Sequence, residues 1–125
     1  MGPGAPALYL GLDCSTQSFS AVVLESSGGR HRVVFDQSLP FDRTLPHYGT
    51  RYGVLPSASP SVAHSSPVMW VEALDLLLAE LAASGLDLRL LAALSGSAQQ
   101  HGSVYMNHGA ARGLDALDPA RPLPP

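Results

Sequence analysis

Residues 8–25 read Leu8-Tyr-Leu-Gly-Leu-Asp-Cys-Ser-Thr-Gln-Ser-Phe-Ser-Ala-Val-Val-Leu-Glu25, and this stretch decides the fold. Leu8 to Leu12 form an apolar run that is long enough for a buried strand. Residues 20–24 form a second run, which is rich in the β-branched residues that strands favour. The residues between the runs are mostly polar and suit a tight turn. The stretch therefore predicts two strands joined by a turn.

Asp13 closes the first predicted strand, at the strand end where many α/β folds keep their chemistry. A carboxylate there can hold Mg²⁺ directly or through water. Ser15 and Thr16 add hydroxyls, and the turn that Gln17 completes adds backbone N–H groups, which can bind an anionic oxygen. These groups predict a site for a magnesium-bound phosphate. A plain hairpin is the alternative, because Asp, Ser and Thr also favour turns through their own hydrogen bonds.

A third strand and a long loop are predicted next. Residues 26–29 form a turn and residues 31–38 a strand, so that three strands make an antiparallel meander. Residues 39–66 contain many prolines, serines and glycines and are expected to form a long loop. Its first half, 41–54, mixes aromatic and charged residues and could pack on the domain, whereas 55–64 is expected to be a flexible surface segment.

A helix is predicted to begin after the N-cap Ser66, with Pro67 in its first position, and to end at Gly85. Its apolar face recurs at helical spacing and consists of Trp70, Leu74, Leu77, Leu78 and Leu81. Residues 90–95 then form a buried strand. A strand reached through a helix is most often parallel to an earlier strand, so its carboxyl end is expected beside Asp13.

A second polar loop, residues 96–103, follows that strand. It carries three side chains that can hydrogen-bond a ligand: Gln99, Gln100 and His101. Their amides and imidazole can pair with the alternating donors and acceptors of sugar hydroxyls. His101 could also act as a general base, or it could merely satisfy buried backbone groups. Residues 103–107 are predicted to form a short strand, and no regular element is predicted from 108 onward.

The composition describes one globular domain and excludes several classes of function. The 125 residues are 46% hydrophobic and carry a net charge of −3 without a basic stripe, which argues against a nucleic-acid partner. All 7 basic residues are arginine, so the chain has neither a P-loop lysine nor a Schiff-base lysine. The single Cys14 can form no internal disulfide.

Targeting signals are absent from the pattern. Residues 1–7 are too short and too rich in Pro and Gly for a signal peptide, and they are expected to be disordered. No apolar run is long enough to span a bilayer, so the expected location is the cytosol. Three scattered histidines are expected to be solvated: His31, His47 and His64.

Four stretches resemble the FGGY carbohydrate kinases, and among these the N-terminal part of the xylulokinases. They are Leu10-Gly-Leu-Asp-Cys-Ser-Thr-Gln17, Phe41-Asp-Arg-Thr-Leu-Pro-His-Tyr-Gly-Thr50, Ser66-Pro-Val-Met-Trp-Val-Glu-Ala-Leu-Asp75 and Leu94-Ser-Gly-Ser-Ala-Gln-Gln-His-Gly-Ser-Val-Tyr105. The first resembles the phosphate motif of the whole actin-like superfamily, whereas the last is more specific to xylulokinases. By this likeness, residues 8–107 form part of an FGGY N-terminal domain and 108–125 an irregular tail.

The resemblance implies an α/β, ribonuclease H-like fold of the actin-like ATPase superfamily. It also implies transfer of the γ-phosphoryl group of ATP to D-xylulose, which yields D-xylulose 5-phosphate. Asp13 would then help to place Mg²⁺-ATP, with three residues beside the phosphates: Ser15, Thr16 and Gln17. Gln100 and His101 match the sugar-contacting position of the family.

The family's catalytic aspartate and its adenosine-binding lobe are expected to lie beyond Pro125. The chain is then part of an active xylulokinase, a non-catalytic remnant that binds sugar or phosphate, or a structural member of the superfamily. The Gln-Gln-His-Gly loop argues against the third hypothesis. The isolated chain is expected to lack kinase activity and to be marginally stable, because it would expose a sheet edge and an apolar surface.

Overall fold

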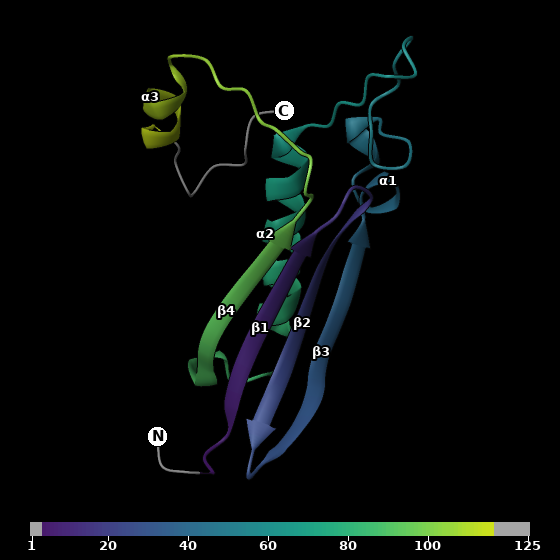
Figure 1. The fold of residues 1–125 in the computed structure, drawn as a ribbon. Helices are drawn as coiled ribbons and strands as arrows, with labels where there is room; N and C mark the ends of the chain where they lie inside the picture. Colours follow the sequence, from purple (N-terminus) through teal and green to yellow (C-terminus); the bar gives the residue numbers. More distant parts are fainter. Residues whose placement is uncertain (1–3, 117–125) are drawn as a thin grey trace.

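The computed structural model describes residues 4–116 and contains one four-stranded sheet with a long helix behind it (Figure 1). The strands are β1 (Ala7–Cys14), β2 (Ser18–Ser27), β3 (Arg30–Pro40) and β4 (Leu91–Ala98), and the long helix is α2 (Pro67–Ala83). The sheet order is β3-β2-β1-β4. The first three strands pair antiparallel, and β4 pairs parallel to β1.

This topology confirms the predicted fold class. Apolar runs form the strands of the meander, helical spacing forms α2, and α2 carries the chain back to a strand parallel to the first. The fold is α/β, and it contains the antiparallel meander, long connection, helix and parallel strand that the residue patterns predicted. None of the helices in residues 4–116 has the length and apolar character needed to cross a membrane.

Three connecting segments differ from the prediction. The expected loop over 39–66 contains the short helices α1 (Phe41–Thr44) and η1 (Pro46–Tyr48), because Phe41 and Leu45 are buried in the core at 0% and 2% exposure. The short strand expected over 103–107 is absent, since these residues pair with no strand among residues 4–116. A short 3-10 helix, η2 (Leu88–Leu90), leads into β4.

The two predicted chain ends lie only partly within the described residues. Ala7, placed in the disordered N-terminus, already belongs to β1. The tail predicted to be irregular contains the helix α3 (Ala110–Asp115). The remaining parts of these two predictions, residues 1–3 and 117–125, lie outside the described residues.

α2 packs on one face of the sheet, and its contact line differs from the predicted one. The buried residues of the helix are Met69, Ala73, Leu77 and Leu81. Leu77 and Leu81 confirm the prediction, whereas Leu78 is 41% exposed. The apolar arc of α2 is wider than the strip that the sheet covers, so packing decides which part of the arc is buried. Ser66 precedes the helix as predicted, but its side chain makes no capping hydrogen bond.

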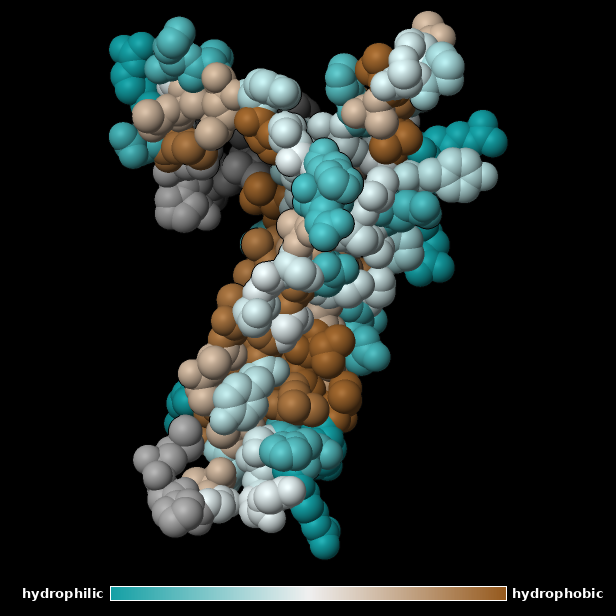
Figure 2. All heavy atoms as spheres, viewed as in Figure 1, coloured by the Kyte–Doolittle hydropathy of each residue, from teal (hydrophilic) through white to brown (hydrophobic). Residues whose placement is uncertain are grey.

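No helix or strand within residues 4–116 covers the opposite face of the meander. Side chains two residues apart share a face of a strand, so the residues between the buried ones point away from α2. Four of these are exposed apolar residues: Tyr9, Val22, Leu24 and Val33. Figure 2 shows apolar side chains gathered over the lower half of the sheet in this view. The predicted apolar surface is therefore present, and the marginal stability inferred from it stays a prediction.

Candidate functional site

Two polar loops leave the same edge of the sheet, at the carboxyl ends of β1 and β4. Their parallel pairing sets Asp13 opposite Ser97. The Ser97 hydroxyl donates a hydrogen bond to Oδ1 of Asp13. An open hollow of about 310 Å³ lies beside this pair; its lining residues are Gly11, Leu12, Asp13, Ser20, Val22, Ser95, Gly96 and Ser97. Asp13 is therefore an exposed carboxylate that lines an open hollow at this edge of the sheet.

The first polar loop, Ser15 to Gln17, is a tight turn shaped by Ser15. The Ser15 backbone N–H donates to the Ser18 carbonyl oxygen at 2.9 Å, and the Ser15 hydroxyl donates to the same oxygen at 3.0 Å. The Ser15 hydroxyl is thus engaged inside the turn. Thr16 and Gln17 are exposed, and their backbone N–H groups donate to no acceptor among residues 4–116. These two N–H groups are the donors that the turn leaves open to an anion.

The second polar loop lies against the first, as predicted. Nε2 of Gln99 donates to the Ser15 carbonyl oxygen at 3.3 Å, which joins the two loops directly. Gln100 and His101 are exposed and make no hydrogen bond with the described part of the chain. The alternative in which His101 satisfies buried backbone groups is therefore wrong. The side chains of Gln100 and His101 remain available to a ligand.

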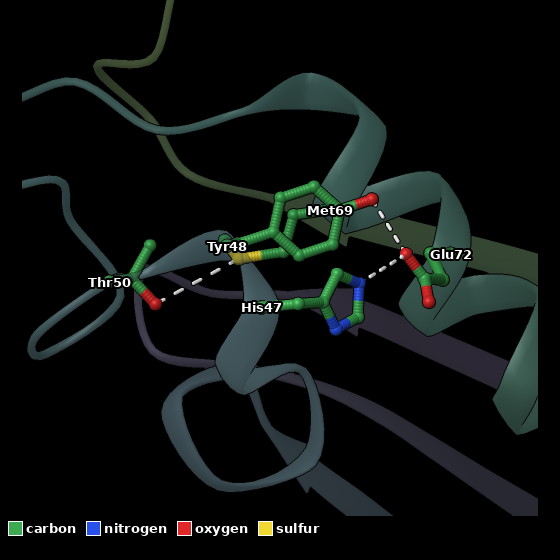
Figure 3. Close-up of polar contacts among 5 residues, drawn as sticks. All are labelled: His47, Tyr48, Thr50, Met69 and Glu72. Carbon is green, nitrogen blue, oxygen red and sulfur yellow. Dashed lines mark hydrogen bonds and ion pairs between the residues drawn. The ribbon is translucent and has the colours of Figure 1, made fainter. Parts of the chain in front are cut away.

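The segment 41–54 connects α2 to this edge of the sheet through a cluster that Figure 3 shows. The Tyr48 hydroxyl donates to Oε2 of Glu72 at 2.6 Å, and Nε2 of His47 lies 3.1 Å from the same oxygen. Burial, followed by the Glu72 hydrogen bond, raises the pKa of Tyr48 to about 12. The pKa of Glu72 is lowered, and the main cause is the hydrogen bond that Glu72 accepts from Tyr48. His47 is exposed, as expected, and it also pairs with Glu72, which the sequence did not predict.

The carboxylate of Asp42 organises the same segment, and the sequence patterns did not single it out. Its oxygens accept hydrogen bonds from the Thr50 hydroxyl at 2.7 Å, the Tyr52 N–H at 2.6 Å and the Gly53 N–H at 3.1 Å. The Thr50 hydroxyl and then the Gly53 N–H hold the pKa of Asp42 below its usual value. Only Gly53, a glycine suited to a tight turn, offered a signal in the sequence.

The hollow offers a magnesium ion a single carboxylate, so water and substrate phosphates would have to supply its other ligands. No group of three or more His, Cys, Asp or Glu side chains within residues 4–116 could hold a metal ion. Asp13 is the one acidic side chain that lines the hollow, as far as the structure describes the chain. Mg²⁺ commonly keeps several waters and takes one or two carboxylates together with substrate phosphates. Asp13 fits this role as a single carboxylate, directly or through water.

Comparisons with known proteins give the chain clear relatives. No protein-family model matches it. Mouse xylulose kinase is 43% identical over 114 residues, which are 91% of this chain and 20% of the mouse protein. Arabidopsis thaliana xylulose kinase 2 is 42% identical over 118 residues, which are 94% of this chain and 21% of the plant protein. The chain thus spans about a fifth of the length of the curated relatives it matches.

A solved structure, the PPX-GPPA enzyme of Aquifex aeolicus, aligns with a TM-score of 0.43 and 10% identity. The alignment covers 75% of this chain and 27% of that one.

Proposed function

The chain belongs to the xylulose kinase family by sequence, and from that premise we propose that it carries the phosphate turn and the sugar loop of an ATP-dependent D-xylulose kinase. One observation carries the proposal: the Gln99 amide donates to the Ser15 carbonyl oxygen, so the two loops are in contact. Phosphoryl transfer depends mainly on holding both reactants side by side, and adjacent binding loops meet that need.

Each loop has its own role in this proposal. The open N–H groups of Thr16 and Gln17 bind phosphate oxygens of ATP, with Ser15 shaping the turn. Asp13 orients the magnesium ion, which when bound neutralises charge on the transferring phosphate. The exposed side chains of Gln100 and His101 hydrogen-bond hydroxyls of D-xylulose. The product is D-xylulose 5-phosphate, and the proposed location is the cytosol.

A chimera tests the proposal with the chain's own residues. The matched segment of mouse xylulose kinase is exchanged for this chain, and ADP formation with D-xylulose and Mg²⁺-ATP is followed by a coupled assay. We expect sugar-dependent turnover. A folded chimera that binds both substrates and transfers no phosphate would favour the non-catalytic remnant instead.

Asp13→Asn in the chimera is expected to lower kcat by about 10- to 100-fold, because a neutral amide orients the magnesium ion poorly. The KM for D-xylulose should change little. Asp75→Asn is the matched control, since Asp75 is exposed on α2 and does not line the hollow beside Asp13. Unchanged kcat in the Asp13 variant would remove Asp13 from the proposed phosphate site.

His101→Ala in the chimera is expected to raise the KM for D-xylulose by about one to two decades. A hydrogen bond lost in a polar site costs about 1–3 kcal/mol, which gives that range. The KM for ATP should stay near its starting value. His31→Ala is the control, since His31 is exposed on β3 and pairs with Ser26, far along the strands from the carboxyl end of β1. A raised KM for ATP with unchanged KM for sugar would contradict the assignment.

A further inference from the structure

Residues 51–54 form a tight hairpin turn within the segment that follows β3. Arg51 and Val54 exchange backbone hydrogen bonds at 2.8 and 3.2 Å. The two residues between them, Tyr52 and Gly53, have φ values of +56° and +78°. Positive φ at both central positions is the geometry of a type I′ turn. Tyr52 carries a Cβ, so its left-handed conformation persists only where the surroundings enforce it.

The backbone of this hairpin lies in direct contact with the proposed phosphate turn, residues 15–17. A Cβ on Gly53 would stand 1.8 Å from the Thr16 carbonyl oxygen and 3.0 Å from the Cα of Gln17. The beginning of the same segment makes a second contact, because the Phe41 N–H donates to the Gln17 carbonyl oxygen at 2.9 Å. The turn is therefore supported from outside the sheet at two successive residues.

Two side chains hold the hairpin in this place: the Ser65 hydroxyl donates to the Gly53 carbonyl oxygen, and Asp42 accepts from the hairpin's N–H groups. The two carboxylate oxygens of Asp42 accept the N–H groups of both left-handed residues, Tyr52 and Gly53. One of these oxygens also accepts the Thr50 hydroxyl. A single side chain therefore satisfies the hairpin's central donors and stabilises its unfavourable backbone conformation. Asp42 makes no contact with the hollow beside Asp13, so its effect on that edge acts through Gly53.

We propose that Asp42 is a positioning residue for the phosphate turn: it fixes the 51–54 hairpin against Thr16 and so holds residues 15–17 in one conformation. That the turn binds phosphate rests on the function proposed above. That Asp42 restrains the turn rests on the contacts of Asp42 and Gly53 alone. A binding turn gains affinity when its donors are fixed before the ligand arrives. Asp42 thus prepares the N–H groups of Thr16 and Gln17 for the anion.

Amide hydrogen exchange on the 125-residue chain tests this proposal. Asp42→Asn replaces the oxygen that accepts the Tyr52 N–H with an NH₂ group, which cannot accept it. The Ser15 N–H, which is bonded within the turn, should then exchange at least about tenfold faster. The amides of Leu10 and Val23, in the centre of the sheet, should keep their rates. Asp36→Asn, at an exposed position on β3, is the control.

Thr50→Val is a second, milder variant, because it removes only the hydroxyl donor to Asp42. It should accelerate Ser15 exchange in the same direction by a smaller factor. An unchanged Ser15 rate in Asp42→Asn would overturn the proposal. Equal acceleration of the amides of Ser15, Leu10 and Val23 would overturn it too, since Asp42 would then support only the fold as a whole.

Titration with Mg²⁺-ATP separates this inference from the proposed function, and it is carried out in the chimera with mouse xylulose kinase, which supplies the remaining four fifths of the relative's length. Binding is followed by the NMR shifts of the Thr16 and Gln17 amides, and the dissociation constant should rise about tenfold in Asp42→Asn. Equal affinities for Mg²⁺-ATP with and without the Asp42→Asn substitution would show that Asp42 does not prepare the turn for the anion. If Asp42→Asn makes the turn more mobile but the chimera never responds to Mg²⁺-ATP, the result would count against the proposed function and support the restraint of the turn by Asp42.

Discussion

Leu77→Ala is expected to lower the free energy of unfolding by about 2–5 kcal/mol. Leu77 is 0% exposed and lies in the middle of the buried line of α2. Its removal takes apolar surface out of the core and leaves a cavity that the rigid sheet can close only in part. Urea unfolding, followed by far-UV circular dichroism and by the fluorescence of Trp70, the only tryptophan, measures the change.

Leu78→Ala is the matched control, since it deletes the same atoms one residue further along the same helix. Leu78 is 41% exposed, so its loss should cost less than about 1 kcal/mol. Equal losses for the two variants would mean that α2 buries the face predicted from helical spacing, including Leu78. That result would contradict the packing seen in the structure.

Gly53→Ala is expected to destabilise the chain by about 2–5 kcal/mol. The left-handed backbone at φ +78° costs a residue with a Cβ about 1–2 kcal/mol. The new methyl group would also stand 1.8 Å from the Thr16 carbonyl oxygen, so the hairpin or the phosphate turn must move. Such overpacking adds about 1–3 kcal/mol. Urea unfolding gives the total, and Ser15 amide exchange shows whether the turn has moved.

Gly49→Ala separates the two costs of the Gly53 variant. Gly49 has φ +65°, and a Cβ there would meet nothing within 4 Å. Its replacement should therefore lower the free energy of unfolding only by the conformational cost of about 1–2 kcal/mol. If both glycine variants lost the same stability, the hairpin would not press on Thr16, and the support of the phosphate turn would need another explanation.

The structure also gives the exposed edge of the sheet a physical description. Among residues 4–116, β4 has a neighbour only on its β1 side, and Leu94 on this strand is 59% exposed. Unpaired strand edges and exposed apolar side chains promote association between chains. Stability measurements on the isolated chain therefore belong at low protein concentration, with the dependence on concentration checked.

Local patterns were sufficient for the four strands, the long helix α2 and their topology, but not for the short helices or the strand expected over 103–107. The apolar runs in residues 8–12 and 20–24 and the helical spacing in α2 each depend on neighbours within a few residues, which a sequence displays directly. The parallel placement of β4 followed from the helix before it, through the handedness of such connections. That placement brought the Gln99 loop beside the Ser15 turn, so the meeting of the two polar loops was predictable as well.

By itself, then, the sequence determined the strands, the long helix, their order and the edge at which Asp13 and the second loop meet. Only the tertiary structure decided which arc of α2 is buried, because the width of the sheet, and not helical spacing, limits the contact between them. It alone revealed the hold of Asp42 on the 51–54 hairpin. Those hydrogen bonds join residues 10 and 11 positions apart in irregular backbone, where no periodic pattern reports which groups will meet.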